Sequence, residues 1–274
     1  MKKTISAIVA SVMAVSAMTA VSASAINLEE ENVLSVSTEA VASTMTIDGT
    51  EVPAGAVAIT VNIDNNNGFV STMTKLNIGE ADVVVDLNGK PVVETSNLLG
   101  ESLITGAENE GLIAFSTASA NVCSLSGEMF TFYVENYNSV NIIESEMFSS
   151  VSTYNDGIST ASSNNYYITG DVDGNYIVNA SDASKVLNVL DTYNRDRLTY
   201  SMVKLIPQMY FPDAISFKAA FIWNLGDDFN ESTANDTNII PISQDTADEI
   251  LEYYTCSRVG ASYEGSYLGL PGLV

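Results

Sequence analysis

The sequence predicts an all-β, jelly-roll-like sandwich over residues 26–155, followed by a small α domain of duplicated loop-helix units over residues 166–258. A period of two in the apolar residues and turn clusters between apolar runs predict the first part. A spaced set of Asp and Asn residues directly before a helical stretch predicts the second. The Ser- and Asn-rich residues 156–165 have the composition of a linker, and the tail, residues 259–274, shows no clear element.

The strands of the sandwich are predicted one by one from local pattern. Val57, Ile59, Val61 and Ile63 alternate with more polar residues, as expected of a strand with one buried face. A strand, an Asn-Gly turn and a second strand follow over residues 83–93. Two further strands are expected, over residues 111–118 and 129–136. The second of these places three apolar side chains on one face: Phe130, Phe132 and Val134.

The first 25 residues are predicted to be a secretory signal peptide. Lys2 and Lys3 precede an apolar run, and Ala23-Ser24-Ala25 fits an A-x-A cleavage site. The run is short for a membrane span and is dominated by Ala and Ser, so a membrane anchor is the weaker interpretation. We therefore expect a secreted, extracellular protein that is not inserted in a membrane and whose mature chain begins near Ile26.

Charge and composition exclude several classes of partner. The net charge of the chain is −24, and without the two signal lysines 8 Lys and Arg remain against 34 Asp and Glu, which gives −26. A surface this acidic repels nucleic acid and anionic lipid. The chain has no His, which is the commonest general base and the commonest zinc ligand. Calcium binding, by contrast, would relieve part of the repulsion.

The two cysteines, Cys123 and Cys256, lie far apart in the sequence and in different predicted parts. A small fold held by disulfides would contain more of them. We expect two buried thiols that act as small apolar residues rather than a disulfide.

The residues from Asp171 to Asp182 have the oxygen pattern of a calcium loop. Calcium takes about six to eight hard oxygen ligands, which a twelve-residue loop supplies from positions 1, 3, 5, 7, 9 and 12. In this sequence those positions are Asp171, Asp173, Asn175, Ile177 through its backbone carbonyl, Asn179 and Asp182. Apolar Val178 is expected to anchor the loop, and the helix that follows has one apolar stripe: Val186, Leu187 and Leu190.

Two positions of the loop depart from the usual calcium pattern. Position 6 is Tyr176 where a Gly normally makes the sharp turn, and position 12 is Asp182 rather than the Glu of EF-hands. A Tyr with positive φ carries strain of about 1–3 kcal/mol, so we expect reduced calcium affinity. The alternative interpretation is an Asx-rich surface turn before a helix N-cap at Ser181 or Asp182. The filling of all side-chain positions together favours calcium.

A second, less complete copy of the unit is expected near the C-terminus. Residues 238–254 align with residues 176–193 so that Asp245 corresponds to Asp182. A twelve-residue loop that ends at Asp245 would begin at Ala234, so this loop is either expanded or degenerate. Its candidate calcium ligands are Asp227, Asp236, Asn238 and Asp245.

The stretch GDVDGNYIVNASDASKVL, residues 170–187, resembles the signature of dockerins, which carry two such units with Asp at position 12 and no entering helix. The resemblance is specific over residues 170–190 and weaker over residues 226–254. It implies calcium as cofactor and a cohesin as partner. Family recognition residues lie at loop positions 10 and 11 and on the following helix, which here are Ala180, Ser181, Leu187 and Asn188.

The N-terminal part resembles a cohesin, the receptor of dockerins. The carrying stretch is residues 52–78, an apolar strand, an Asn-rich turn, a Gly and another strand, and later strands fit as well. In that family the strand after the turn lies in the binding sheet, which nominates Ser71, Met73 and Lys75. The family often has Asn and Asp there, so this departure indicates a distinct specificity. Plain core packing is the alternative for Met73.

A signal peptide, one cohesin and one dockerin together resemble the cellulosomal adaptor scaffoldins of the ScaC type. The resemblance implies a non-catalytic adaptor that is held at the cell surface through the cellulosome. Its dockerin would dock into a cohesin of a larger scaffoldin. Its own cohesin would capture the dockerin of another protein, such as a polysaccharide-degrading enzyme.

Two other functions fit the composition less well. A hydrolase needs paired carboxylates or a nucleophile with a base. The glutamates of the β part are instead expected at strand ends or in turns, on solvated surface: Glu128, Glu135, Glu144 and Glu146. A carbohydrate-binding module in the same chain as a dockerin is the closer alternative. Such modules stack sugars on exposed Trp and Tyr, whereas this part has no Trp and its aromatic residues are mostly Phe at core-facing positions, such as Phe115, Phe130 and Phe132.

Overall fold

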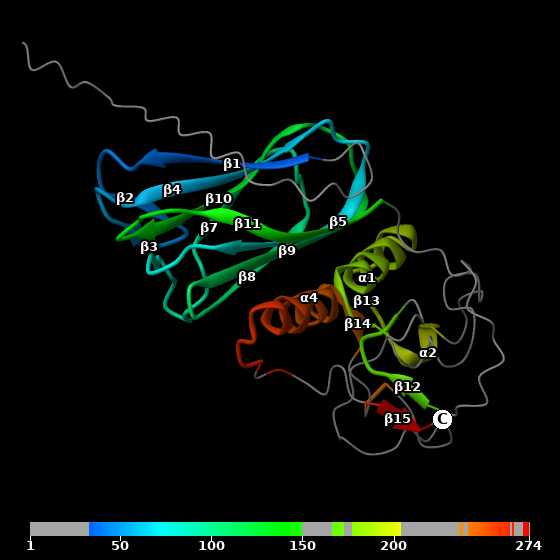
Figure 1. Ribbon diagram of the computed structural model, residues 1–274. Coiled ribbons are helices and arrows are strands. Elements are labelled where there is room, and N and C mark those ends of the chain that lie inside the picture. Colours follow the sequence, from blue (N-terminus) through cyan, green and yellow to red (C-terminus); the bar gives the residue numbers. More distant parts are fainter. Residues whose placement is uncertain are drawn as a thin grey trace, which may run out of the picture.

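The computed structural model describes residues 33–149, 166–172, 177–203, 236–237, 241–263, 265 and 271–273. These residues form a β-sandwich and a pair of long helices that lie against one of its two sheets (Figure 1). The predicted signal peptide lies outside them. Within the described part of the chain, no helix has the length and apolar character needed to span a membrane.

The first sheet of the sandwich has β4 and β10 at its centre. Its strands are β1 (Val33–Ala40), β4 (Val57–Asp64), β10 (Gly127–Glu135), β6 (Asp82–Val83) and β7 (Val93–Thr95). All its pairs are antiparallel, and β10 pairs with β4 on one side and with β6 and β7 on the other. The Asn-Gly hairpin predicted between residues 83 and 93 is confirmed, because Val85 and Pro91 form a bridge across it.

The second sheet has the strand order β11-β5-β9-β8 and is also antiparallel throughout. Its strands are β11 (Asn141–Phe148), β5 (Phe69–Asn77), β9 (Leu112–Cys123) and β8 (Leu103–Asn109). A short hairpin, β2 (Met45–Ile47) with β3 (Thr50–Val52), packs with Tyr133 in a separate apolar cluster. Two facing antiparallel sheets confirm the predicted β-sandwich.

The core of the sandwich lies between the inward faces of the two sheets. Phe115 is at its centre, with its ring centroid 4.9 Å from those of both Phe130 and Phe132. Gly106 lies directly opposite Phe115 in the β8–β9 pair. A Cβ atom on Gly106 would meet the Phe115 ring at 2.6 Å, so the ring occupies the space that a side chain would need. The period of two on β4 is confirmed by three inward residues with no exposure: Ile59, Val61 and Ile63.

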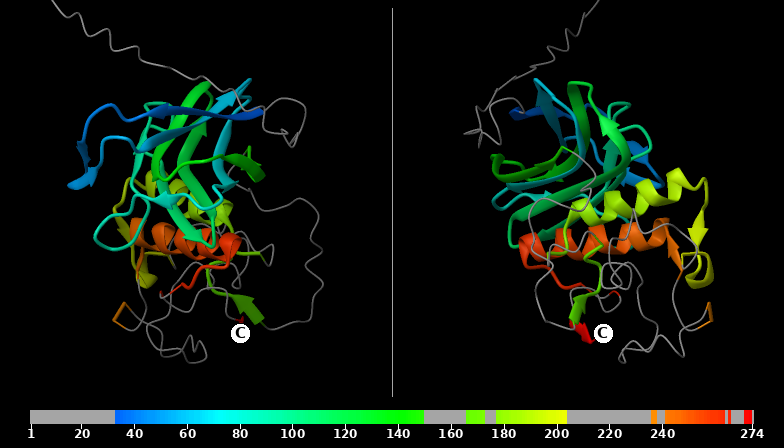
Figure 2. Two further views of the ribbon diagram at one scale, coloured as in Figure 1. Left: turned by 60° about the vertical axis from the view of Figure 1, so that its left-hand side comes forward. Right: turned by 90° about the vertical axis from the view of Figure 1, so that its right-hand side faces the viewer.

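Helices α1 (Ala180–Thr192) and α4 (Gln244–Val259) lie side by side beneath the second sheet, as both views in Figure 2 show. The shorter elements of this half are β12 (Tyr166–Ile168), β13 (Arg197–Leu198), α2 (Tyr200–Val203), β14 (Ile242–Ser243) and β15 (Pro271–Leu273). The two helices share an apolar cluster that includes Ala183, Val186, Ala247, Ile250 and Leu251. The predicted stripe of α1 is confirmed, with Val186 and Leu190 buried and Leu187 packed at the edge.

The two ends of the helical half are tied together by a backbone pair. Strand β12 pairs with β15 in antiparallel register, Tyr166 opposite Leu273 and Ile168 opposite Pro271. The tail therefore contains a strand where the sequence predicted no clear element. Three residues are too few for a recognisable period, and the pairing is non-local, so sequence pattern alone does not reveal it.

Candidate functional site

The outward face of the β11-β5-β9-β8 sheet has small side chains at its centre. On β9, Ala114, Ser116 and Ala118 alternate with the inward core residues and have no exposure. The register places Met73 beside Ser116 and Ser71 beside Ala118. Ser71 and Met73, both predicted as contacts for a partner, are fully buried beneath the helices rather than in the sandwich core. Small residues keep the face flat, which lets a helix approach it closely.

Helix α1 contacts this face through short polar side chains. The Ser184 hydroxyl donates to the carbonyl of Val70 over 3.0 Å and accepts from the amide of Ser119 over 3.3 Å. The side-chain amide of Asn188 donates to the carbonyl of Ala120 over 3.1 Å. Asn188 is a predicted recognition residue, whereas Ser184 was not predicted. These bonds fix the position of α1 along the strands.

The remaining predicted recognition residues lie at or beside the same contact. Ala180 is fully buried in the apolar cluster that joins Met73 to the helices. Leu187 packs at the edge of that cluster. Ser181 is buried, and its amide donates to the side-chain oxygen of Asn179 over 2.7 Å. The structure therefore brings together residues predicted independently for two separate interfaces.

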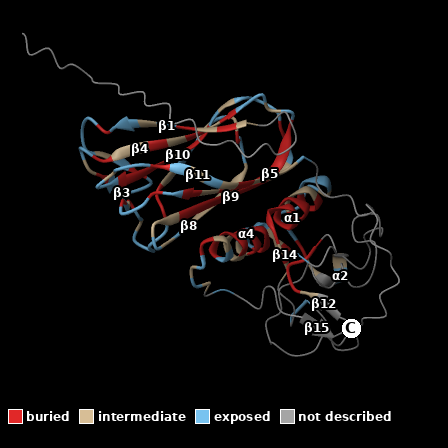
Figure 3. Cartoon of the chain, in the orientation of Figure 1, coloured by how far each residue is buried: buried red, intermediate tan, exposed pale blue. Residues whose placement is uncertain are grey.

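Helix α4 lies next to the second sheet, and both contain buried residues (Figure 3). It contacts strand β11 through charged and aromatic residues. The Tyr254 hydroxyl donates to Glu146 Oε2 over 2.5 Å. The Arg258 guanidinium forms ion pairs with Glu144 and, at 3.4 Å, with Glu146. Burial raises the pKa of Tyr254, and its hydrogen bond to Glu146 raises that pKa further, so the phenol stays a donor at neutral pH.

Two of the four glutamates are placed differently from expectation. Glu144 and Glu146 were expected on solvated surface at strand ends or in turns. They lie within β11 on the face turned towards α4, where each binds a side chain of that helix. Glu128 and Glu135 are exposed, as expected. An acidic residue at every second position is the signal that could have identified a polar face on this strand.

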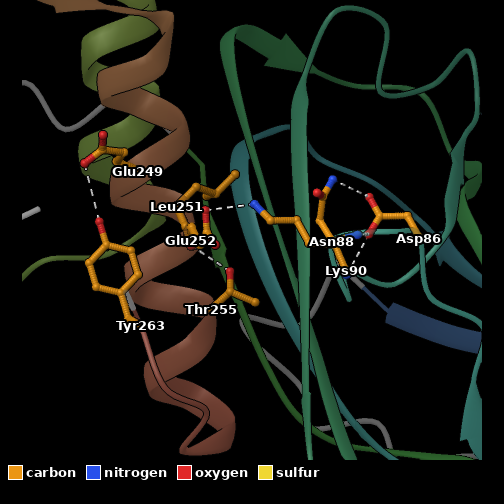
Figure 4. A network of polar contacts seen from close by, with 8 residues as sticks. All are labelled: Asp86, Asn88, Lys90, Glu249, Leu251, Glu252, Thr255 and Tyr263. Carbon is orange, nitrogen blue, oxygen red and sulfur yellow. Dashed lines mark hydrogen bonds and ion pairs between the residues drawn. The ribbon is translucent and has the colours of Figure 1, made fainter. Parts of the chain in front are cut away.

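An ion pair also links α4 to the Asn-Gly hairpin of the sandwich (Figure 4). Lys90 Nζ lies 2.9 Å from Glu252 Oε2. Asp86 holds the turn, because its Oδ1 accepts from the backbone amides of Asn88 at 2.8 Å and Lys90 at 2.9 Å. The bond from the Lys90 amide is the main reason that the pKa of Asp86 lies below its usual value. The turn therefore presents Lys90 from a fixed backbone.

The two thiols are both free and buried, as predicted, but they lie in different environments. Cys256 on α4 packs against the outward face of the sheet, in a small cluster with Ala107 and Ala114. Nearby, the side-chain amide of Asn109 donates to the carbonyl of Val259 over 3.0 Å. Cys123 instead belongs to the sandwich core. Burial raises the pKa of the Cys256 thiol.

The predicted calcium loop is tied to α1 by Asp182. Its Oδ1 accepts from the amide of Val172 over 2.7 Å, and its Oδ2 accepts from the amide of Asn179 over 2.8 Å. Asn179, rather than Ser181 or Asp182, is the N-cap of the helix. Asp171, Asn179 and Asp182 are all buried. The start and end of the predicted loop therefore lie together.

The other positions of this loop are described in part. Ile177 has an exposed side chain, which suits a residue predicted to contribute only its backbone carbonyl, and Val178 packs against the helical cluster. Asp173 and Asn175 lie outside the described residues. Among the residues that are described, no three His, Cys, Asp or Glu side chains are grouped closely enough to hold a metal ion. The donors that are described, two carboxylates and an amide, are hard oxygens of the type calcium takes.

The start of α4 corrects the correspondence between the two units. The N-cap of α4 is Ser243, and its backbone amide donates to the hydroxyl of Thr246 over 3.0 Å. In α1 the backbone amide of the N-cap, Asn179, donates to the carboxylate of Asp182 in the same way. The helix starts therefore pair Asp182 with Thr246 rather than with Asp245. Asp245 is exposed. A hydroxyl thus occupies the place of the carboxylate.

Of the other predicted ligands in the second unit, only Asp236 is described. It is exposed, and its Oδ1 accepts from the amide of Ser201 over 2.8 Å. Asp227 and Asn238 lie outside the described residues.

No protein-family model matches the sequence, and no curated protein matches it either. Among solved structures, the chain is similar to a non-cellulosomal cohesin from the hyperthermophilic archaeon Archaeoglobus fulgidus, with 17% identity and a TM-score of 0.24, over 34% of this chain and 78% of that one. It is also similar to the second type II cohesin module of the cellulosomal adaptor ScaA scaffoldin of Acetivibrio cellulolyticus. That match has 13% identity and a TM-score of 0.23, over 35% of this chain and 67% of that one.

Proposed function

We propose that this protein is a non-catalytic adaptor that joins two other proteins through two separate interfaces. The β11-β5-β9-β8 face is the receptor for a helix pair of dockerin type, and α1 with α4 forms such a helix pair. The observation that carries this proposal is the seating of α1 and α4 on that face. It supports the view that the sheet accepts helices of this kind and that these helices fit a flat sheet.

The chemistry of the contact suits recognition between proteins. Small residues such as Ala114 and Ala118 allow close approach, and Ser184 and Asn188 add directional hydrogen bonds to backbone carbonyls. Charged pairs at the edge add selectivity, since a wrong partner would leave those charges unpaired. The contact has an apolar centre and a polar rim, as protein interfaces commonly do.

Calcium is proposed as the cofactor of the helical half. Asp171, Asn179 and Asp182, together with Asp173, Asn175 and the carbonyl of Ile177, would hold it. The ion would fix the loop against the start of α1 and so set the direction of the recognition face. In the second unit, Thr246 at the place of a carboxylate supports weaker binding or none.

The finer assignment concerns location and partners. We infer that the protein is secreted and works in a cellulosome, where its helical half docks into a scaffoldin cohesin and its sandwich captures a dockerin of another subunit. The signal-peptide pattern, the acidic charge and the signature over residues 170–187 support this assignment.

A sugar-binding role for the sandwich finds no support in its phenylalanines. Phe115, Phe130 and Phe132 are at most 1% exposed, so their rings are not available for stacking on a carbohydrate.

A binding panel tests the proposal. The full-length protein is immobilised and exposed to dockerin-bearing proteins, to isolated cohesins and to soluble polysaccharides, each with calcium and with EDTA. We expect binding to at least one member of each protein panel, with cohesin binding lost in EDTA. Binding to a polysaccharide and to neither protein panel would overturn the adaptor assignment.

A further inference from the structure

We propose that the contact between the helix pair and the sheet is a closed state of the chain. In this state each binding face masks the other, and an outside partner has to displace the chain's own half before it binds. This inference rests on the proposed function, because the masked faces are the ones assigned to partners above. In the closed state, the sheet face is thus occupied by the helix pair of the same chain.

Unpartnered hydroxyls indicate that this contact opens. Among the described residues, three hydroxyls are buried without a hydrogen-bond partner: Ser71 Oγ, Thr74 Oγ1 and Ser116 Oγ. Ser71 and Ser116 face the helices. Thr74 lies on the inward side of the same sheet, next to the hydroxyls of Thr72 and Thr117, which bind each other over 2.9 Å. Burying a hydroxyl without a partner costs free energy, and opening returns Ser71 and Ser116 to water.

The rim of the contact is held by ion pairs that remain accessible to solvent. The Lys90 and Glu252 side chains are 51% and 36% exposed, and Arg258 is 27% exposed. Exposed pairs are weak and are screened by salt. The rim therefore steers closure without locking it.

The connection between the halves keeps them at high local concentration. Residues 149–165 join β11 to β12 in one chain. Covalent linkage of two binding partners in one chain can give an effective concentration on the order of millimolar. If the separated halves bound each other with a dissociation constant of about 10 µM, the population of the closed state would be about 100 times that of the open state. Outside partners would then bind about 100-fold more weakly than to the open chain.

The two cysteines provide a direct measure of closure in the full-length protein. Cys256 is covered by the sheet, whereas Cys123 is covered by the sandwich core. The rate of reaction with a disulfide reagent such as DTNB is measured for each thiol, using Cys123→Ala and Cys256→Ala to separate the signals. We expect Cys256 to be protected to a degree that does not depend on protein concentration.

Charge changes on α4 and β11 test the cause of that protection. Arg258→Glu should raise the Cys256 rate by 10-fold or more and leave the Cys123 rate unchanged. Arg197→Glu, the same change at an exposed residue of β13, is the matched control and should have no effect. Combining Glu144→Arg with Arg258→Glu should restore protection. Circular dichroism checks that the helices persist, and Glu146→Lys on the sheet provides a second opening variant if Arg258→Glu loses helix.

Two results would overturn the closed state. One is a wild-type Cys256 rate equal to that of the urea-unfolded protein. The other is protection that disappears on dilution, which would place the contact between two copies of the chain. Neither result depends on the partner panel, so the closed state and the adaptor function are refuted by different measurements.

Discussion

Asp182 connects the start of the predicted calcium loop to the start of helix α1. Both of its oxygens accept backbone amides, one from Val172 near the start of the predicted loop and one from Asn179 at the helix cap. The residue is fully buried. Asp182 is therefore a structural link between loop and helix as well as a proposed calcium ligand.

We predict that Asp182→Ala destabilises the helical half by about 2–3 kcal/mol in EDTA, since two buried amides lose a charged acceptor. Urea unfolding followed by circular dichroism at 222 nm measures this change. Asp245→Ala is the control, because Asp245 is exposed and surface substitutions usually change stability by less than about 0.5 kcal/mol. Equal losses of stability from Asp182→Ala and Asp245→Ala would argue against a special structural role for Asp182 at the start of its helix.

Gly106 supports a second prediction at the same scale. Gly106→Ala would place a methyl group against the Phe115 ring, which is fixed among Phe130 and Phe132. Overpacking of this kind typically costs about 1–3 kcal/mol. Denaturant unfolding of the sandwich measures the loss. In a Phe115→Leu background the same change should cost less, and an undiminished cost there would show that the clash is not with the ring.

At the scale of elements, α1 depends on the loop before it. We predict that EDTA lowers the melting temperature of the helical half and leaves the sandwich transition in place, because a ligand that binds only the folded state stabilises that state. Differential scanning calorimetry with calcium and with EDTA separates the two transitions. Identical thermograms would contradict a bound ion at Asp171–Asp182.

Elements with a clear period could be predicted from sequence, and elements fixed by distant contacts could not. Strand β4 and helix α1 show their buried faces as a period in the residues themselves. Strand β15 depends on a partner about a hundred residues away, as its register with β12 shows. No local pattern encodes such a pair.

The candidate site follows the same division. Asn188 and Met73 were found by family resemblance, and the structure places both in one interface. The roles of Glu144 and Glu146 were missed because they depend on Arg258, which is distant in sequence. The predicted correspondence of Asp245 with Asp182 is wrong by one residue, because the alignment matched two carboxylates. The helix caps instead place Thr246 at the position that Asp182 has in α1.

At the scale of the whole molecule, charge governs the closed state. The chain carries a net charge of −24 with only 10 Lys and Arg, and two of these cations, Lys90 and Arg258, bridge the sandwich and the helices. Loss of such bridges leaves two acidic halves that repel each other.

We predict that raising the salt concentration to about 0.5 M increases the radius of gyration, because screening at this ionic strength weakens exposed ion pairs. Small-angle X-ray scattering at low and high salt measures the change. Arg258→Glu should already be expanded at low salt and should respond little. Contraction of the wild-type chain at high salt would show that repulsion between the halves, rather than attraction at the rim, dominates.

The β12–β15 pair also bears on how the protein responds to mechanical load. The chain enters this pair at Tyr166 and leaves it at Leu273, and these two residues lie opposite each other. A pull between the sandwich and anything attached beyond Leu273 would peel the pair open one hydrogen bond at a time instead of shearing all of its bonds together. The two strands would thus separate at low force, and the chain would lengthen before the helices bear any tension.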